Sequence, residues 1–358
     1  MPGVYISYPF CAQKCTYCNF ASGVFPAELE ARYLAALKTE IANHCWQWMP
    51  ETVYIGGGTP SNLDPYTLAS LLDFVPNRPW IEATLEAAPG SITAEKANAW
   101  VKCGFNRASL GAQSFVEREV RGAGRKHTAA IVAADVAALR HAGFGSINID
   151  LIAGLANQTE AGWRESLDWI ERLAPEHVSV YMLEVDEESR LGNEILLGGK
   201  RYGASSAPSD EMTADLYEFA VERLASLGIE RYEISNFSRP GFESRHNLKY
   251  WRREPYVGFG ADAHSFDGSM RSQNPEAPDE YLRVTREEGT PVNAAEEKLF
   301  VGLRLSEGVN LLREDWIRFE APIRRFAGIG LLAINGANVR LTARGVLLSN
   351  EIFQEFLL

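Results

Sequence analysis

The sequence predicts an α/β fold built on a parallel sheet, followed by a smaller C-terminal domain of helices with a short β element. Two observations predict it. Short β-branched or aromatic runs alternate with amphipathic helical stretches through the first two thirds of the chain, and the pattern changes after about residue 290. Alternation at this spacing favours parallel strands joined by helical crossovers. At 358 residues, the chain is long enough for two or three domains.

Six short runs predict the strands of this sheet, and five amphipathic stretches predict the helices between them. The strands are expected at residues 4–8, 52–55, 81–85, 107–110, 146–151 and 178–183. The helices are expected at residues 27–45, 66–74, 93–102, 128–141 and 159–173. In the first helix, residues recurring every four positions share one buried face: Leu29, Tyr33, Leu37 and Ile41.

The last third of the chain lacks this regular alternation. Residues 186–209 are polar and rich in Gly and Ser, which indicates a surface excursion or linker. A helix is expected at 212–227, and short strands mix with loops up to about residue 288. Near the C-terminus we expect helices at 314–320, 323–327 and 342–357 and a short strand at 339–341. We therefore divide the chain into residues 1–230, a connecting segment at 231–290, and a small α+β domain at 291–358.

Composition and charge exclude several classes of protein. With 46% hydrophobic and 23% charged residues, the chain has an ordinary globular composition, which argues against disorder and coiled coil. The formal net charge is −12, so there is no excess of cations for nucleic acid or for an anionic membrane surface. Residues 291–358 hold eight Lys and Arg against eight Asp and Glu, which argues against DNA binding by the small domain.

Targeting signals are also missing from the sequence. No apolar run approaches the roughly 20 residues that cross a bilayer. Residues 1–10 contain neither the basic stretch nor the long apolar stretch of a signal peptide. We therefore expect a cytoplasmic protein without stable membrane insertion.

Three of the five cysteines, Cys11, Cys15 and Cys18, fall within eight residues as C-x3-C-x2-C. Disulfides would leave one thiol unpaired, and a thioredoxin-type pair would leave Cys11 without a role. A structural zinc site needs four ligands, and no fourth Cys or His lies nearby. Three thiolates on a four-iron cluster would leave one iron open for an exchangeable ligand, and the spacing favours this interpretation. Cys45 and Cys103 lie in apolar helical patterns and are expected to be buried.

The cysteine pattern, with Tyr17 before its last member, resembles the signature of radical S-adenosylmethionine (SAM) enzymes. In that family three cysteines hold a [4Fe-4S] cluster, SAM chelates the open iron, and reduction cleaves SAM to a 5′-deoxyadenosyl radical. The preceding residues 5–10 resemble the oxygen-independent coproporphyrinogen III oxidase group and its heme-chaperone branch. The resemblance runs from Tyr5 to the C-terminal domain. It implies a partial (βα)6 TIM-like radical SAM barrel with a small winged-helix-like domain at the C-terminus.

Residues that contact SAM are implied by the same resemblance. Residues 56–60, Gly-Gly-Gly-Thr-Pro, follow a predicted strand, and a glycine-rich loop permits close approach of the backbone to a ligand, although such a turn alone is more often structural. No Gly-Lys-Ser/Thr follows, so the loop is not a P-loop. Polar residues at or after strand ends either face the active site of a parallel barrel or cap helices. The positions that match the family's SAM contacts are Tyr5, Tyr17, Gly57, Gly58, Thr59, Glu86, Gln113, Arg125 and Asp150.

Two motifs separate the branches of the group. The oxidases place a fourth cysteine two residues after Cys18, whereas this chain has Phe20 there, as the heme-chaperone branch does. The group usually carries a histidine where this chain has Ser7, so a polar imidazole is missing beside the expected cluster. A second motif resembles the H-N-x-x-Y-W signature of the heme chaperones, which the oxidases lack: His246-Asn247-Leu248-Lys249-Tyr250-Trp251.

From the residues alone, a histidine beside an aromatic pair is compatible with ligation of heme iron and equally with packing in a loop. No Cys-x-x-Cys-His sequence for covalent heme attachment is present. The resemblance implies that His246 ligates one heme per chain with support from Asn247, Tyr250 and Trp251. His264 is a second candidate ligand.

The resemblance implies a heme chaperone that passes heme to an acceptor protein, such as a respiratory heme protein. The cluster and SAM would then act as structural or regulatory elements. The alternative is a radical SAM enzyme that acts in coproporphyrinogen III oxidation, methyl transfer or anaerobic heme opening. A zinc-binding scaffold is a third hypothesis. No catalytic residue is assigned, and the residues leave open whether the chain forms a homodimer and whether SAM is cleaved.

Overall fold

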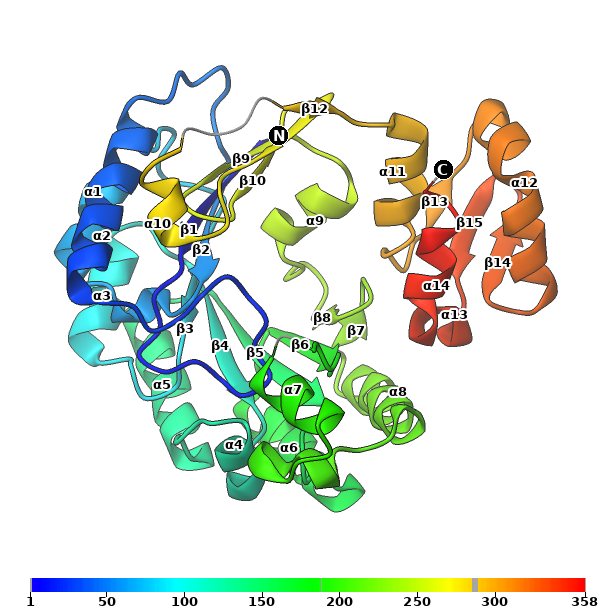
Figure 1. The fold of residues 1–358 in the computed structure, drawn as a ribbon, viewed down its shortest axis with the longest axis horizontal. Helices are drawn as coiled ribbons and strands as arrows, with labels where there is room; N and C mark the ends of the chain where they lie inside the picture. Colours follow the sequence, from blue (N-terminus) through cyan, green and yellow to red (C-terminus); the bar gives the residue numbers. More distant parts are fainter. Residues whose placement is uncertain (1, 188, 285–288, 358) are drawn as a thin grey trace.

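The N-terminal part of the chain is a partial barrel of parallel strands with helices on its outer face (Figure 1). The structure is a computed structural model and describes residues 2–187, 189–284 and 289–357. The barrel strands are β1 (Gly3–Tyr8), β2 (Thr52–Gly57), β3 (Glu82–Ala87), β4 (Arg107–Gln113), β5 (Ser146–Ala153) and β6 (His177–Met182). Each is parallel to the next in chain order, so the predicted parallel sheet is confirmed.

Helices cover the outer face of these strands (Figure 1). They are α1 (Ala27–Ala42), α2 (Pro65–Leu72), α3 (Ala94–Lys102), α4 (Glu117–Gly122), α5 (Ala129–Ala142), α6 (Glu160–Leu173) and α8 (Asp210–Ser226), with a 3-10 turn, η1, at Pro60–Asn62. Tyr33, Leu37 and Ile41 of α1 are fully buried, which confirms the predicted face. Only α4 is absent from the sequence prediction, because six residues are too short for a helical period to show.

Strands from residues 230–291, the segment after α8, extend the sheet at both edges. At one edge β9 (Tyr256–Phe259) runs parallel to β1, and beyond it lie β10 (His264–Phe266), β11 (Met270–Gln273) and β12 (Thr290–Pro291). At the other edge, β8 (Asn236–Ser238) is antiparallel to β6, and β7 (Glu230–Arg231) is antiparallel to β8. Two short helices, α9 (Arg245–Trp251) and α10 (Pro278–Tyr281), belong to the same segment. This segment is therefore part of the barrel sheet.

The region expected to be a surface excursion contains ordered helices. These are α7 (Arg190–Leu196) and a 3-10 stretch, η2 (Arg201–Ser206). Leu191 is buried and its amide donates to the carbonyl of Thr16, 2.8 Å away. Many residues of this stretch are exposed, as expected of a surface excursion, but α7 was not predicted because seven residues are too few for a clear helical period in a Gly-rich stretch. The expectation for Cys103 is confirmed, whereas Cys45 is exposed because α1 ends at Ala42.

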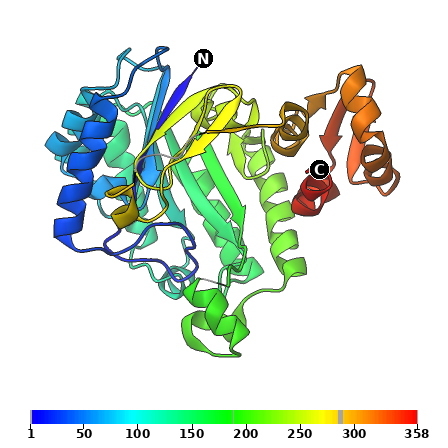
Figure 2. The same cartoon turned by 45° about the horizontal axis from the view of Figure 1, so that its top comes forward.

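A separate lobe beside the barrel forms the C-terminal domain (Figures 1 and 2). Its elements are α11 (Ala294–Gly302), β13 (Val309–Asn310), α12 (Arg313–Gly328), β14 (Leu332–Asn335), β15 (Asn338–Leu341), α13 (Ala343–Leu347) and α14 (Ser349–Gln354). The three strands form an antiparallel sheet in the order β13-β15-β14. Helices followed by a small antiparallel sheet match the predicted α+β domain.

Two details of this domain differ from the sequence prediction. The two helices expected around Pro322 are one helix, α12, because Phe319, Ile323 and Phe326 bury one continuous face across the proline. The single helix expected at 342–357 is two helices that meet at Leu348, whose backbone angles are non-helical. Among the described residues, no helix is long and apolar enough to span a bilayer.

The packing of α6 against α8 gives a direct test of the core. Trp163 of α6 is fully buried, and its indole Nε1 donates to the carbonyl of Leu216 at 2.7 Å. We expect Trp163→Ala to lower the free energy of unfolding by about 4 kcal/mol, because it leaves a cavity and an unpaired carbonyl. Urea denaturation measures the change. Replacement of the exposed Tyr66 by Ala is the control and should shift stability by less than about 0.5 kcal/mol.

Candidate functional site

The inner face of the barrel is polar in every strand. Outward-facing residues such as Val4, Ile6, Val53 and Ile55 belong to the hydrophobic core. The alternate residues face inward: Tyr5, Thr52, Tyr54, Thr84, Glu86, Arg107, Ser109, Asn148, Asp150, Ser179 and Tyr181. Many of them contact one another across neighbouring strands, as Tyr54 does with Tyr5 and Glu86, and Ser109 with Asp150. A barrel that served only for stability would fill this space with branched apolar side chains. The interior of this barrel is therefore built to hold polar groups.

The cysteine loop lies directly after β1, at the carboxyl ends of the barrel strands. The amide of Cys11 donates to Gly23 O at 2.8 Å, which closes the loop upon itself. On one side, the amide of Thr16 donates to Ala123 O at 3.2 Å. On the other, the guanidinium of Arg190 in α7 donates to the carbonyl of Lys14. Contacts with two separate elements thus fix the shape of the loop.

The three thiols are close enough to influence one another. Burial raises the pKa of Cys11, the hydroxyls of Thr59 and Ser22 oppose the rise, and the neighbouring Cys18 and Cys15 add to it. Among the described residues, no three Cys, His, Asp or Glu side chains converge on a single ion position. A four-iron cluster does not require such convergence, because each thiolate binds a different iron.

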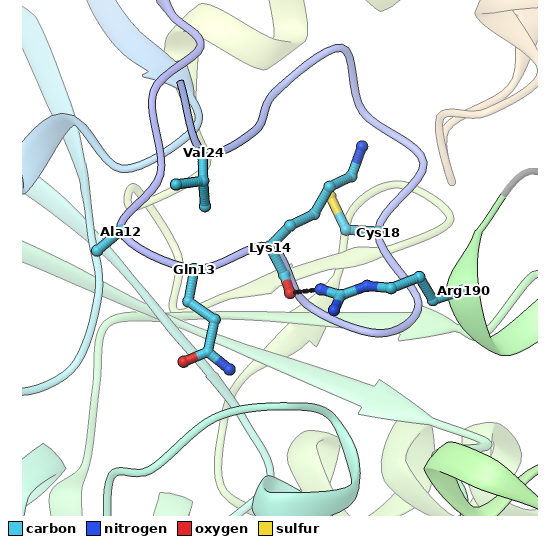
Figure 3. Close-up of a pocket in the computed structure, with 6 residues that line it drawn as sticks. All are labelled: Ala12, Gln13, Lys14, Cys18, Val24 and Arg190. Carbon is cyan, nitrogen blue, oxygen red and sulfur yellow. Dashed lines mark hydrogen bonds between the residues drawn. The ribbon is translucent and has the colours of Figure 1, made fainter. Parts of the chain in front are cut away.

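The loop frames a pocket of about 440 Å³ (Figure 3). The residues that line it are Ala12, Gln13, Lys14, Cys18, Val24 and Arg190. Cys18 lines this pocket, and Cys11 lines a second one with Tyr8 and Phe10. Three thiols on one loop have the chemistry that a [4Fe-4S] cluster needs, and Cys11, Cys15 and Cys18 would hold it.

The glycine-rich loop after β2 approaches the cysteine loop very closely. The amide of Gly58 donates to Tyr8 O at 2.7 Å, and that of Thr59 donates to Phe10 O at 3.0 Å. A Cβ on Gly58 would lie 2.6 Å from Phe10 O, so only glycine fits there. Gly57 has a φ of 109°, and its amide donates to Glu86 Oε2 at 3.1 Å. This loop therefore joins the cysteine loop to the inner face of the barrel.

Glu86 and Asp150 place two carboxyl groups in the barrel interior. Burial raises the pKa of Glu86 to about 7, the hydrogen bond from Tyr54 OH at 2.9 Å opposes the rise, and Asp150 adds to it. Burial also raises the pKa of Asp150, against hydrogen bonds that include one from Asn148 at 2.7 Å. The carboxyl oxygens of Glu86 and Asp150 can accept hydrogen bonds from hydroxyl or ammonium groups of a ligand.

Gln113, Arg125 and Tyr17 form the other side of the same opening. Arg125 donates to the carbonyl of Gly111 at 2.7 Å. Burial lowers the pKa of Arg125, but the adjacent Tyr17 and Cys15 outweigh that effect and the pKa lies above its usual value. Gln113 Oε1 and Arg125 Nε are buried and have no hydrogen-bond partner among the described residues. Such unsatisfied groups are costly unless a ligand pairs with them, and a zwitterion such as SAM has the charges to do so.

Three comparisons place the chain among known proteins. Residues 5–170 match the radical SAM superfamily model, and residues 290–348 match the HemN C-terminal domain model. The heme chaperone HemW of Bacillus subtilis (strain 168) is 34% identical, with 100% of this chain and 99% of that protein covered. HemW of Mycobacterium tuberculosis (strain ATCC 25618 / H37Rv) is also 34% identical, with 99% and 94% covered.

The chain belongs to the HemW family of radical SAM proteins. Membership of the radical SAM superfamily implies a [4Fe-4S] cluster and SAM, which together supply reductive cleavage of SAM when bound. Coproporphyrinogen III oxidase (HemN) from Escherichia coli has the same fold, with a TM-score of 0.85, 22% identity, and 99% of this chain and 90% of that chain covered. The predicted radical SAM barrel with a C-terminal domain is confirmed.

The H-N-x-x-Y-W string of this HemW-family chain lies at the opposite end of the barrel from the cysteine loop. It forms α9, which covers the first residues of the strands. Glu82, at the start of β3, accepts hydrogen bonds from the amides of Arg245 and His246 at 2.8 and 3.0 Å. A Cβ on Gly3, the first residue of β1, would lie 3.1 Å from Nδ1 of His246. The string therefore closes the amino end of the barrel.

Both ring nitrogens of His246 are engaged in this position. Nδ1 lies 2.9 Å from Thr52 Oγ1, Nε2 lies 2.8 Å from Tyr250 OH, and the side chain is 1% exposed. Burial, then the charges of Lys249 and Arg107, lower the pKa of His246 to about 3, so the imidazole is neutral. The second candidate, His264, is exposed at the start of β10. Heme ligation by His246 stays a prediction, and it requires α9 to leave the position described.

The sequence-predicted SAM contacts, which stay a prediction, include only part of the inner face. The structure brings Tyr5, Glu86 and the glycine loop together through Tyr54, whose ring stacks on Tyr5 at 6.1 Å between centroids and whose hydroxyl donates to Glu86. Tyr54, Arg107 and Tyr181 were not singled out. The signal for them was present, because polar residues recur at alternate positions in each barrel strand.

Gly58→Ala should disrupt the cysteine loop without disrupting the barrel. The added methyl group clashes with the backbone of Phe10, so the loop must shift. After reconstitution, we expect iron content well below the about four irons per chain of a full cluster. Gly328→Ala is the matched control, because that position has open space, and its iron content should equal the wild type. A normal cluster in Gly58→Ala would contradict the role of this contact.

The buried His246 should make stability depend on pH. The folded protein keeps the imidazole neutral, whereas the unfolded chain takes up a proton below its ordinary pKa of 6.5. Stability is therefore lost as pH falls below 6.5, and from about pH 7 to about pH 5.5 this group contributes about 1 kcal/mol of that loss. Urea denaturation at about pH 7 and about pH 5.5 measures the free energy of unfolding at each pH. The loss between the two should be smaller by about 1 kcal/mol in His246→Asn than in the wild type. Replacement of the exposed His141 by Asn should leave this dependence of stability on pH as it is in the wild type.

Proposed function

We propose that this protein is a heme chaperone that binds one heme per monomer and passes it to an acceptor protein. The observation that supports this most is the match over the full chain to relatives named heme chaperone HemW, with barrel and C-terminal domain both covered. The H-N-x-x-Y-W string is intact. Phe20 stands where the oxidases carry a fourth cysteine, which argues against coproporphyrinogen III oxidation.

His246 is the proposed iron ligand, with Asn247, Tyr250 and Trp251 in support. A neutral imidazole is the form that binds iron, and His246 is held in that form. Its present partners are hydroxyl groups of Thr52 and Tyr250, which a metal can replace once α9 is displaced. We further propose that the protein acts in the cytoplasm on acceptors such as respiratory heme proteins.

The cluster and SAM are proposed to have a structural or regulatory role. They would be held by Cys11, Cys15 and Cys18 and by the SAM-contact set around the glycine loop. The contacts of these residues leave a second function open, because Gln113 and Arg125 present unsatisfied buried groups where a reacting SAM would sit. The alternative is therefore a radical SAM enzyme that turns over a substrate.

A heme titration under anaerobic conditions tests the proposal. Reconstituted wild type, His246→Ala and His264→Ala are titrated with hemin and followed by absorbance. We expect saturation near one heme per chain in the wild type and in His264→Ala, and clear weakening in His246→Ala. Equal binding by wild type and His246→Ala would reject the assigned ligand. Absence of binding by the wild type would reject the chaperone function.

A second measurement addresses the enzyme alternative. The reconstituted protein is incubated with a reductant, SAM and either coproporphyrinogen III or heme, and the products are analysed by mass spectrometry. We expect no porphyrin product and no stoichiometric 5′-deoxyadenosine. Turnover with either substrate would place the enzyme function first.

A further inference from the structure

Helix α9 is held on two sides, by the barrel and by the C-terminal domain (Figure 1). On the barrel side, Glu82 accepts hydrogen bonds from its first turn, and His246 lies against Thr52. The ammonium group of Lys249 pairs with Glu51 and, at 3.3 Å, with Glu254. These contacts keep His246 in the closed position described above.

The C-terminal domain contacts the opposite end of α9 and Arg253, two residues beyond the last residue of the helix. Arg253 Nε pairs with Glu297 Oε2 at 3.2 Å, and both side chains are less than one fifth exposed. Arg271 of β11 pairs with the other oxygen of Glu297 at 3.0 Å. The guanidinium of Arg304 lies over the rings of Trp251 and Phe353, 4.9 and 5.1 Å from their centroids. Partly buried ion pairs and cation–π contacts of this kind are worth more than exposed ones.

A second connection runs from the domain to the start of α9. The amide of Ser306 donates to the carbonyl of Tyr232 at 2.9 Å. The hydroxyl of the same tyrosine accepts from the amide of Ser244, the N-cap of α9, at 3.1 Å. The domain therefore supports both ends of the helix.

We infer that the C-terminal domain is a clamp that holds α9 closed and thereby controls access to His246. Neither ring nitrogen can reach iron while α9 is in place, and α9 cannot leave the barrel while Glu297 and Arg304 hold its C-terminal end. Release of the domain is then a step before heme ligation. The part of this inference that concerns heme rests on the proposed function, whereas the clamp itself does not.

A matched pair of variants on α11 tests the clamp. Glu297→Lys breaks the pairs with Arg253 and Arg271 and places a cation between them. Glu296→Lys makes the same charge change one residue earlier, but there the lost partner is Arg318 of α12, inside the domain. Hydrogen exchange of the α9 amides and the association rate of hemin are measured on reconstituted full-length protein. Circular dichroism and cluster content verify folding.

We expect Glu297→Lys to speed both α9 exchange and hemin association several-fold, and Glu296→Lys to match the wild type. The gain in hemin association should disappear in Glu297→Lys/His246→Ala. Wild-type exchange in Glu297→Lys would overturn the clamp even if heme binds normally. Faster exchange without any heme binding by the wild type would support the clamp and reject the chaperone function. If Glu297→Lys fails to fold, Arg304→Gln, which removes the contacts with Trp251 and Phe353, takes its place with the same expectations.

Discussion

The parallel pairing of β1 with β2 is the constraint on which both ends of the barrel depend. Its register runs from Gly3↔Thr52 to Tyr8↔Gly57. At the carboxyl end, this register places Gly58 in contact with the residues that lead into the cysteine loop. It also lets the amide of Gly57 donate to Glu86. At the amino end, it leaves room beside Gly3 for the ring of His246. A slip of one residue would exchange the inner and outer faces of the strand and destroy both contacts.

The polar interior allows the barrel to bind polar groups of a ligand, which an apolar core cannot do. Buried carboxyl and imidazole groups cost free energy unless they are paired, and here hydroxyl and amide groups of neighbouring strands pair with them: Tyr54 with Glu86, Ser109 with Asp150, and Asn148 with His177. Several buried atoms have no hydrogen-bond partner among the described residues: Gln113 Oε1 and Arg125 Nε beside the cysteine loop, Arg107 Nε in the interior, and Trp251 Nε1 in α9 at the other end. Gln113 and Arg125 lie beside the cysteine loop, where a bound ligand would pair with their free atoms, whereas at the closed end both ring nitrogens of His246 already have partners.

The position of α9 at the amino end of the barrel changes the interpretation of the H-N-x-x-Y-W string. In the sequence alone, it is a histidine beside aromatic residues, which is compatible with ligation of heme iron and with stacking on a porphyrin. In the fold, His246 and Tyr250 hydrogen-bond to each other inside the barrel, and Trp251 meets Arg304 of the C-terminal domain. One short helix thus joins the two parts of the chain and carries the proposed heme ligand. A chaperone that must hold and then release its cargo has reason to keep the ligand on an element that can be freed.

The sequence was sufficient to predict the six barrel strands, the longer helices that cover them and the cysteine loop, because these follow from local periodicity and from a motif contiguous in the chain. It also indicated the C-terminal domain through the change of pattern. The SAM contacts named from the sequence stay a prediction. The three-dimensional fold was needed to show that α7 supports the cysteine loop, that Tyr54 links Tyr5 to Glu86, and that His246 is buried with both nitrogens engaged. These depend on contacts between residues far apart in the chain, which no local pattern encodes.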